Sequence, residues 1–472
     1  MRQIDISPLA PSRFADLIGP QRWAAFEEAA LAARTVLGDR IMWNVNATAQ
    51  GGGVAEMLQI LLAYGQGAGT DTRWLVLDGE SEFFATTKRL HNVLHGMPGD
   101  GGDFGPAERA NYEEVLARNL ETTEGVVRPG DVVILHDPQT AGLIPGYRGL
   151  GAHVVWRSHI GRDVPNEHTA RGWAFLEPYL SEAEGVIVTR VGYAPPSVPA
   201  EKIVIIAPSI DPFSTKNAEL SPDMVRDSLI RVRLLAGEDH HNTLTFHRRD
   251  GAHGHVEART GLLVEGGVLP PDARIILQVS RWDRLKDMPG VMRGFTEHLD
   301  VPDDAHLVLC GPAVEGVTDD PEGAEVLEEC REVWRGLSPE MRDRVHLVCV
   351  PMDDLDENAH IVNALQRHAY AVVQKSLFEG FGLTVTEAMW KARPVIASAI
   401  GGIQDQIVDG RDGLLLPDPT NLADLGAAMG KLLASPQMAA TLGAAAKQRV
   451  LTDFVGDRHL MQYGSLLKAL LS

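Results

Sequence analysis

The stretch KSLFEGFGLTVTEAMWKARPVIASAIGG, residues 375–402, decides how the rest of the chain is interpreted. An apolar run at 369–374 predicts the buried strand that leads into it, and a helix is predicted from about residue 383. Pro394 then opens a second apolar run, PVIASAI, which predicts another strand. A strand, a glycine-bearing loop, a helix and a strand form a parallel crossover unit. Ligands of such sheets bind at the carboxyl ends of the strands, so the loop at 375–381 is a candidate binding loop.

Two glutamates frame this unit, Glu379 in the loop and Glu387 on the helix, with seven residues between them. The backbone N–H groups where the helix begins have no intrahelical partner, so they can bind anionic oxygens or sugar hydroxyls. A carboxylate beside them can accept hydrogen bonds from two adjacent sugar hydroxyls, and Glu387 can reach a second diol such as a ribose. By itself this spacing is a weak signal, because glutamate usually lies on a solvated face. The residues around these N–H groups are Gly380, Phe381, Gly382 and Leu383.

Taken whole, the stretch resembles the signature of the retaining glycosyltransferases of family 4. The resemblance implies the GT-B fold, an α/β architecture of two doubly wound Rossmann-like domains that face each other across a cleft. In that family the first glutamate of E-x7-E holds donor-sugar hydroxyls and the second holds the nucleotide ribose, which implies these roles for Glu379 and Glu387. The wording GFGLTVTEAMWK at 380–391 and GGIQDQIVDG at 401–410 is similar to that of the trehalose glycosyltransferring synthases within the family.

Length and charge limit the class of protein. At 472 residues the chain is too long for one ordinary core, which predicts two domains. The net charge of −21 argues against a nucleic-acid partner or an anionic membrane surface. The three cysteines lack metal-ligand spacing and indicate a reducing compartment. We find no signal-peptide pattern and no run of about 20 apolar residues, so we expect a cytoplasmic protein without a membrane anchor.

The expected domain boundary is the segment APSIDPFS at 207–214, where two prolines and a change of composition predict a linker. Residues 1–210 then form the N-terminal, acceptor-side domain, with a C-terminal helix at 455–472 packing back onto it. Residues 211–454 form the C-terminal domain that binds the nucleotide-sugar donor.

Two regions carry a less regular pattern. Residues 1 to about 20 are expected to form an arm, and residues 215 to about 268 a helical and polar stretch. The latter contains the basic loop FHRRDG at 246–251, which either reaches a phosphate or is simply solvated.

A second glycine-rich loop, NATAQGGG at 46–53, follows the first predicted strand. Such a loop before a helix can cradle a phosphate, or it can be a tight turn. It lacks the Lys-Ser/Thr of a P-loop and the spaced glycines of a dinucleotide site. The resemblance implies that Gly52 and Gly53 lie close to the donor phosphates and the acceptor.

Histidines follow two strands of the N-terminal half. His136 and Asp137 end the strand at 132–135, where they either orient a hydroxylated acceptor or form a packed ring and a turn cap. The resemblance favours acceptor binding by Asp137. It also implies that His159 faces the donor sugar, through its backbone carbonyl as well as its ring. The role of the nearby Asp163 stays open.

Arg281 and Lys286 lie just beyond the strand predicted at 275–279. Two cations there can clamp a diphosphate, since arginine offers a planar fork and lysine a point charge. Alternatively they are surface residues offset by Asp283 and Asp287. The resemblance implies diphosphate binding, so we predict Arg281, Lys286, Glu379 and His159 as the catalytic group.

The leading hypothesis is glucosyl transfer from a nucleoside-diphosphate glucose to glucose, which forms α,α-trehalose reversibly and with retention. The alternatives are a trehalose phosphorylase, a glucosyltransferase with another small acceptor, and a sugar-binding relic of the same fold. We expect no tightly bound cofactor, because the nucleotide-sugar is a substrate. Mg2+ is compatible with such a donor, but no metal-ligand cluster indicates it. The expected partners are small molecules, and the sequence leaves a homodimer open.

Overall fold

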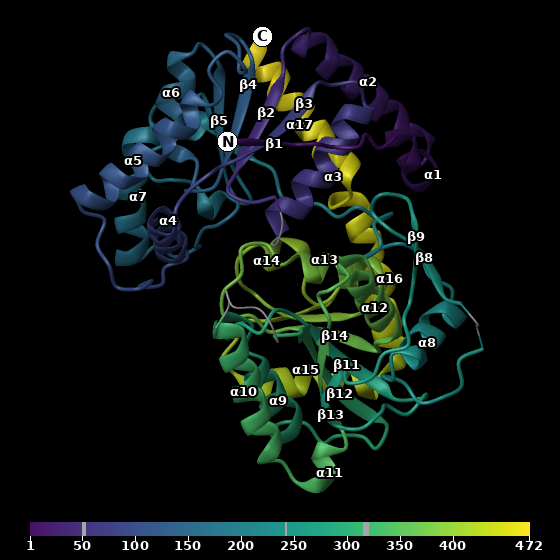
Figure 1. The fold of residues 1–472 in the computed structure, drawn as a ribbon. Helices are drawn as coiled ribbons and strands as arrows, with labels where there is room; N and C mark the ends of the chain where they lie inside the picture. Colours follow the sequence, from purple (N-terminus) through teal and green to yellow (C-terminus); the bar gives the residue numbers. More distant parts are fainter. Residues whose placement is uncertain (50–52, 241–242, 315–320) are drawn as a thin grey trace. The chain divides into compact units, whose positions relative to one another are not determined.

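The computed structural model describes residues 1–49, 53–240, 243–314 and 321–472. The chain forms two compact units, each built around a mainly parallel sheet (Figure 1). Unit 1 comprises Met1–Ser209 together with Phe454–Ser472, and unit 2 comprises Ile210–Asp453. The expected α/β class with two doubly wound sheets is therefore confirmed.

The sheet of unit 1 has seven strands in the order β1-β3-β2-β4-β5-β6-β7. All neighbouring strands are parallel except β1, which pairs antiparallel with β3. The strand order reverses between β2 and β4, and such a switch point is where open α/β sheets bind ligands. The strands are β1 Arg2–Ile4, β2 Met42–Asn46, β3 Thr72–Val76, β4 Val132–His136, β5 His153–Ser158, β6 Gly185–Val188 and β7 Ile203–Ile205.

Helices cover both faces of this sheet (Figure 1). Val133 and Leu135 of β4 belong to the core cluster that includes residues of α4, α5 and α7. Val132 and Ile134 belong to the cluster that includes residues of α2, α3 and α17. Because both faces are buried, the strands read as continuous apolar runs. The helices are α1 Ala15–Ile18, α2 Pro20–Leu37, α3 Gly53–Gly67, α4 Ser81–Leu94, α5 Pro106–Glu121, α6 Ile144–Gly149, α7 Glu167–Leu180 and α17 Gly456–Leu471.

The prediction that residues 1 to about 20 form an arm was wrong. β1 adds an antiparallel edge strand, with Gln3 opposite Leu75. Phe14 is fully buried, and its ring centroid lies 4.7 Å from that of Tyr64. The pairing and burial come from β3 and α3, which lie far along the sequence, so no local pattern announced them.

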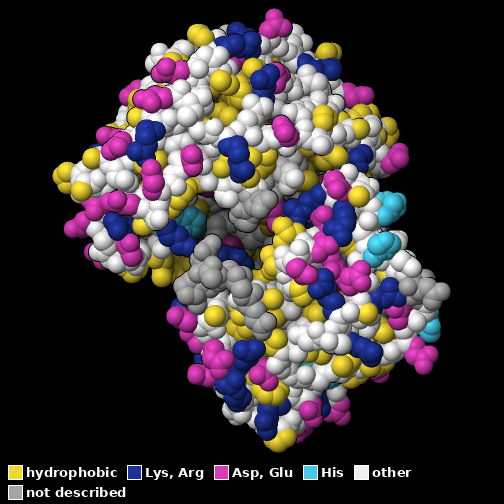
Figure 2. All heavy atoms as spheres, in the orientation of Figure 1, with side chains coloured by type: hydrophobic (Ala, Val, Ile, Leu, Met, Phe, Trp, Pro, Cys, Tyr) yellow, Lys and Arg dark blue, Asp and Glu magenta, His cyan; other side chains and the backbone are white. Residues whose placement is uncertain are grey.

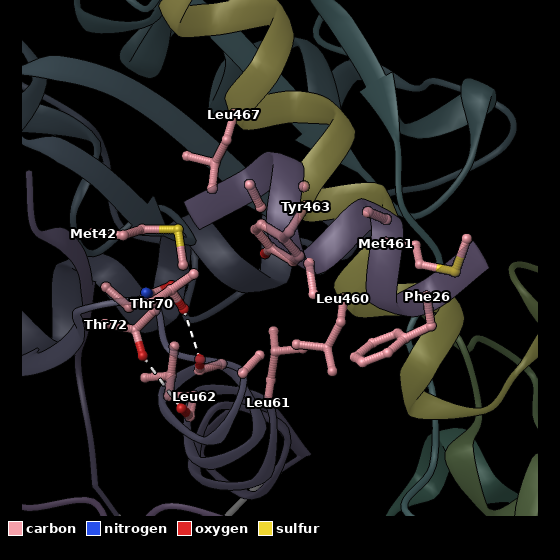
Figure 3. A pocket seen from close by; sticks show the side chains of 17 residues that line it. Phe26, Met42, Leu61, Leu62, Thr70, Thr72, Leu460, Met461, Tyr463 and Leu467 are labelled. Atoms are coloured by element: carbon pink, nitrogen blue, oxygen red, sulfur yellow. Dashed lines mark hydrogen bonds between the residues drawn. The ribbon is translucent and has the colours of Figure 1, made fainter. Parts of the chain in front are cut away.

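The C-terminal helix α17 packs on α2 and α3 within unit 1. Between these helices and the sheet lies a small apolar cavity of about 50 Å3, lined by side chains such as Phe26, Leu61, Leu460 and Leu467 (Figure 3). α17 also supplies partners for Arg157 of β5, which is buried at 1% exposure. The guanidinium donates to His459 at 3.1 Å and to the hydroxyl of Tyr463.

The main sheet of unit 2 has the order β10-β13-β12-β11-β14-β15-β16, with β10 antiparallel and the others parallel. From β13 to β16 this is the 3-2-1-4-5-6 order of a Rossmann fold, whose switch point lies between β11 and β14. The strands are β10 Leu263–Glu265, β11 Arg274–Val279, β12 Ala305–Pro312, β13 Val345–Val350, β14 Ala371–Gln374, β15 Val395–Ser398 and β16 Leu414–Leu416.

Helices also pack against the strands of unit 2, and they meet in one core cluster around Phe295, Leu307 and Leu347. The helices are α8 Pro222–Arg231, α9 Met288–Glu297, α10 Pro321–Arg335, α11 Pro339–Arg342, α12 Leu355–His368, α13 Leu383–Trp390, α14 Ile403–Gln406, α15 Leu422–Ala434 and α16 Pro436–Asp453.

The stretch 215–268 is not simply helical and polar, as the sequence had suggested. After α8 it forms a hairpin, β8 Thr245–His247 with β9 His253–His255, and then β10. β10 joins the main sheet by pairing with β13, and a strand of three residues is too short for its sequence pattern to predict this pairing. In the basic loop, Arg248 pairs with Asp354 and Arg249 with Asp356 at 2.8 Å. These two ion pairs therefore connect the basic loop to the N-terminal end of α12.

Charged side chains of both signs are interspersed on the face shown in Figure 2, which fits a solvated surface with a net charge of −21. Cys310, Cys330 and Cys349 are all buried, and none of these three cysteines forms a disulfide. Within the described ranges, no helix is long and apolar enough to cross a membrane.

Candidate functional site

In unit 2 the predicted donor residues gather at the carboxyl edge of the sheet, at the β11/β14 switch point. The loop after β11 and the loop after β14 are tied together by the N–H of Leu377, which donates to the carbonyl of Leu285 at 2.7 Å. Beneath them Gln374 donates to Ser280 and to Ser376, both at 3.1 Å. This buried amide network fixes the two loops at the position where a ligand of such a sheet binds.

Lys286 and Glu379 form the centre of this arrangement. Lys286 ends the 3-10 turn Arg284–Lys286, and its Nζ lies 2.6 Å from Oε2 of Glu379. Both side chains are mostly buried, at 15% and 14% exposure, and Ser376 donates to the same carboxylate oxygen at 3.2 Å. The structure therefore joins two residues that the sequence had predicted separately, one as phosphate ligand and one as sugar ligand.

The loop that carries Glu379 is shaped by glycine and by one distant glutamine. Gly382, at the N-cap of α13, has φ of +84°, and a Cβ there would lie 3.2 Å from Cγ of Glu379. Gln406 donates to the carbonyl of Phe381 at 2.5 Å and accepts from the hydroxyl of Thr386 at 2.6 Å. Among the described residues no side chain caps the first turn of α13. Its N–H groups at Gly382 and Leu383 therefore remain suited to anionic or hydroxyl oxygens.

Glu387 lies one turn further along α13 and is 6% exposed. Its carboxylate is 3.8 Å from the ammonium of Lys216, and its backbone carbonyl accepts from Lys391 at 3.3 Å. It is therefore a buried, charge-paired carboxylate, which distinguishes it from a glutamate on a solvated face.

Arg281 differs from Lys286 in its surroundings. Its side chain is 68% exposed and pairs with Asp283 at 3.1 Å. Arg281 therefore lies in the loop after β11, but it pairs with a different carboxylate from the one that Lys286 contacts. Because the guanidinium is largely in solvent, its contact with Asp283 is a weak one, and Arg281 can turn toward another anion at little cost.

In unit 1 a chain of hydrogen bonds connects Asn44, in the middle of β2, to residues at the carboxyl ends of β4 and β5. The ring of His136 lies 3.0 Å from Oδ1 of Asn44 through Nε2 and 3.0 Å from Nε2 of His159 through Nδ1. Burial, followed by the charge of Arg157, lowers the pKa of both rings well below the usual value, so both are neutral. With the amide of Asn44 oriented so that Oδ1 faces the ring, His136 carries its proton on Nε2 and His159 donates from Nε2. In this orientation Nδ2 of Asn44 is buried without a partner in the described part of the chain. Nδ1 of His159 is then a hydrogen-bond acceptor.

Asp137 is held in an unusual backbone conformation beside this chain. Its φ is +64°, in the left-handed region that aspartate tolerates better than most residues. Its Oδ1 accepts from the backbone N–H of His159 at 2.8 Å. Burial raises the pKa of Asp137 from 3.8 to about 7, against the opposing effects of that N–H and of Arg157. A strained, partly buried carboxylate at a strand's carboxyl end is the kind of group that binding sites retain.

The remaining predicted positions are less informative. Gly52 lies outside the described residues, and Gly53 is the exposed first residue of α3. Asp163 pairs with Arg190 at 2.7 Å. In the part of the chain that the structure describes, no group of three or more histidines, cysteines or acidic residues could hold a metal ion.

Sequence reasoning missed the residues that hold these side chains in place: Asn44, Ser376 and Gln406. Ser376 and Gln406 fall inside the two stretches that carried the resemblance, so a search for polar residues next to the motif could have found them. Asn44 offered no such signal, because it lies inside an apolar strand and meets His136 only through the pairing of β2 with β4.

Comparisons with known proteins identify the family of the chain. The family model "Trehalose synthase, N-terminal domain" matches residues 44–195, and "Glycosyl transferases group 1" matches residues 264–449. The trehalose synthase of Pyrococcus horikoshii is 32% identical over 97% of this chain and 95% of its own. That of Rubrobacter xylanophilus is 34% identical over 90% of this chain and 88% of its own. A trehalose phosphorylase of Pleurotus pulmonarius is 27% identical over 81% of this chain but only 50% of its own.

Among solved structures, the sucrose-phosphate synthase of Thermosynechococcus elongatus superimposes with a TM-score of 0.63 at 19% identity, covering 92% of this chain and 99% of that one. Fold and family matches together define the class, a glycosyltransferase of the GT-B fold. Within that class, the chain belongs to the trehalose synthase family.

Proposed function

We propose that this chain is a retaining glucosyltransferase that moves glucose from a nucleoside-diphosphate glucose to glucose and forms α,α-trehalose, in a reversible reaction. The observation that supports this most strongly is the ion pair of Lys286 and Glu379 at the β11/β14 switch point of unit 2. A cation for phosphate and a carboxylate for sugar hydroxyls, side by side, match the two halves of a nucleotide-sugar. The names of the relatives supply trehalose as the product.

In this proposal unit 2 binds the donor. Lys286 and Arg281 bind the diphosphate, together with the N–H groups from Gly380 to Leu383. Glu379 binds hydroxyls of the donor glucose, and Glu387 binds the ribose. The departing phosphate, neutralised by these groups, accepts the proton of the incoming hydroxyl on the same face of the sugar. The protein contributes positioning and fixed charges.

Unit 1 supplies the groups for the sugars. His159 meets the donor glucose through its carbonyl and through Nδ1, the acceptor nitrogen that the chain from Asn44 leaves unprotonated. Asp137 binds a hydroxyl of the acceptor, and its carboxylate form is the stronger hydrogen-bond acceptor.

Product analysis by NMR tests the proposal. Purified protein is incubated with glucose and, in separate samples, UDP-, ADP- and GDP-glucose, and with trehalose plus each nucleoside diphosphate. A non-reducing α,α-linked disaccharide, absent with Glu379→Gln, supports the proposal and identifies the base. Donor consumption without a disaccharide rejects glucose as the acceptor.

A phosphorylase is the second candidate, favoured by the likeness to the Pleurotus enzyme. It predicts that trehalose plus inorganic phosphate, without any nucleotide, yields glucose and glucose 1-phosphate. Turnover in that sample and none with nucleoside diphosphates would replace the first proposal by the second.

A further inference from the structure

Unit 2 contains a second concentration of positive charge, at the opposite edge of its sheet from Lys286 and Glu379. Residues 367–369 precede β14 and residues 391–394 precede β15, so they lie at the amino edge. The donor loops lie at the carboxyl edge, beyond a strand of four residues, or about 13 Å. α13 joins the two edges, because it begins after Gly382 and ends before Lys391.

These residues enclose a pocket of about 360 Å3. Among the described residues that line it, four cations face a single carboxylate, Glu219. In a chain with a net charge of −21, such an excess of positive charge is unusual. The charged and titratable lining residues are Arg367, His368, Lys391, Arg393 and Lys447, with Glu219.

The pocket is rigidly built. Lys391 and Arg393 flank Ala392, whose φ of +56° is uncommon for a residue with a Cβ. This turn is pressed against α16 at Gly443, where a Cβ would lie only 2.2 Å from the carbonyl oxygen of Ala392. Lys391 is 3% exposed and is held by the side chains of Gln366 at 2.7 Å and Asn217 at 3.2 Å. The cations are therefore placed before any ligand arrives.

Two side-chain nitrogens of the pocket, one in Arg393 and one in His368, have no partner among the described residues. Arg393 uses Nε for the carbonyl of Lys391 at 3.1 Å and Nη1 for that of Ala369 at 2.9 Å, while Nη2 has no partner among the described residues. Nε2 of His368 is buried without a hydrogen-bond partner in the described part of the chain. The ammonium of Lys447 forms only a long ion pair with Glu219, at 3.9 Å, and lies 5.1 Å from the centroid of the Trp390 ring. A buried polar atom without a partner is rare enough to require an explanation.

The positive charges of the cluster also repel one another. Burial and then the charge of Arg367 lower the pKa of Arg393, and burial and then Arg393 lower the pKa of His368. Burial lowers the pKa of Lys391 to about 7, with Glu387 opposing the shift and Arg367 adding to it. Capping the carboxyl ends of α12 and α13 accounts for two bonds of Arg393. Arg367 is held by the carbonyls of Asn217 and Ala218 and by Glu219, and the ammonium of Lys391 by three acceptors of its own. What these contacts leave unexplained are Nη2 of Arg393 and Nε2 of His368.

We propose that this pocket binds a phosphate dianion, either as free phosphate or as a phosphate monoester. Nη2 of Arg393 and the ammonium of Lys447 suit the oxygens of a tetrahedral dianion, and so does Nε2 of His368 in the tautomer that carries its proton there. The volume is in the range of small-molecule sites and admits a sugar on the ester oxygen. Such a ligand acts on α13 from the end remote from Glu379 and does not compete with the nucleotide. The proposal does not rest on the proposed function.

Isothermal titration calorimetry of the full chain in phosphate-free buffer, with inorganic phosphate and glucose 6-phosphate as separate probes, tests this. Arg393→Gln and Lys447→Gln are each expected to weaken binding about tenfold or more. Lys447 is 40% exposed, so its variant should fold normally. Glu219→Gln, which removes the opposing carboxylate, is expected to tighten binding. The probe that binds more tightly then shows whether the pocket takes free phosphate or a phosphate monoester.

Arg335→Gln is the matched control, because Arg335 of α10 is 55% exposed and pairs with Glu328 elsewhere on unit 2. Its isotherm should equal that of the wild type. Lys286→Met should also bind phosphate normally, and loss of binding in that variant would assign the ion to the donor loops instead. No saturable binding to Glu219→Gln protein would overturn the proposal and leave the cations as helix caps.

Discussion

At the scale of single residues, the pairing of Lys286 with Glu379 links two roles that the sequence treats as separate. Under the proposed function, removal of Lys286 takes away a phosphate ligand, and it also leaves the mostly buried carboxylate of Glu379 without its cation. Removal of both partners avoids that second cost. The two substitutions should therefore not act independently.

We predict that Lys286→Met weakens binding of the nucleoside diphosphate about tenfold or more, while Glu379→Gln lowers turnover and leaves that binding nearly unchanged. In the double variant, binding should recover part of the loss seen with Lys286→Met. Calorimetric titration of the four proteins forms a double-mutant cycle. Strictly additive free energies would show that the ion pair does not couple the two sites.

Asp137 leads to a prediction about pH. Its pKa in the folded protein, about 7, exceeds its ordinary 3.8, so the folded state holds the proton more tightly and the wild type loses stability as pH rises between these values. An asparagine at this position would tolerate the same φ and accept the same N–H. Asp137→Asn should therefore raise the free energy of unfolding, and by about 1–2 kcal/mol more at pH 8 than at pH 5.

Denaturant unfolding of both proteins at the two pH values measures this difference. A gain that is equal at both would show that the carboxyl is already ionised at pH 5. If Asp137 binds the acceptor, the stabilised variant should also lose activity. The ionised carboxylate would then be the group that binds the acceptor and also the group whose burial lowers the stability of the folded protein.

At the scale of elements, we expect the substitution of glycine by alanine to have opposite effects at two helical positions. Gly464 lies within α17 beside the cavity of Figure 3, and a Cβ there would meet Ala33 at an ordinary 3.5 Å. Gly464→Ala should stabilise unit 1 by about 0.5–1 kcal/mol, because alanine loses less backbone entropy in a helix.

Gly443→Ala in α16 is the matched control. Its Cβ would lie 2.2 Å from the carbonyl oxygen of Ala392, so the packing must shift, at a cost of about 1–3 kcal/mol. Thermal unfolding should show a higher midpoint for the first variant and a lower one for the second. A shift in the same direction for both would mean that helix propensity alone, and not these contacts, decides the outcome.

At the scale of the whole molecule, the last residues of the chain complete the first unit. Deletion of residues 454–472 removes His459 and Tyr463 from the buried Arg157 and opens one face of the sheet. We predict that the deletion destabilises unit 1 by more than about 3 kcal/mol, because a buried charge loses its partners. Unit 2 is a continuous segment and should still unfold as before and bind the nucleoside diphosphate.

Calorimetry that resolves two unfolding transitions tests this prediction, since a chain of two domains is not a two-state system. Tyr463→Phe, which removes one hydroxyl, should give a smaller shift of the same transition. Equal shifts of both transitions would show that the two units unfold together.

Much of the fold could be predicted locally. The strand predicted at 275–279 and the helix predicted from about residue 383 are confirmed at β11 and α13. Buried parallel strands can be predicted from apolar runs in the sequence, and glycines indicate the loops that follow them. The arm at 1–20 and the stretch at 215–268 were wrong because β1 and β10 are three-residue edge strands whose partners lie far along the chain.

By itself, the sequence determined the α/β class, the candidate loops and the residue types in them, because these depend on local pattern. Only the tertiary structure decided which side chains meet. Lys286 reaches Glu379 across 93 positions, and His136 reaches Asn44 across 92. Strand order brings such residues together, and strand order depends on how the crossover helices pack on both faces of each sheet. That packing is a property of the whole core, which no single stretch of sequence encodes.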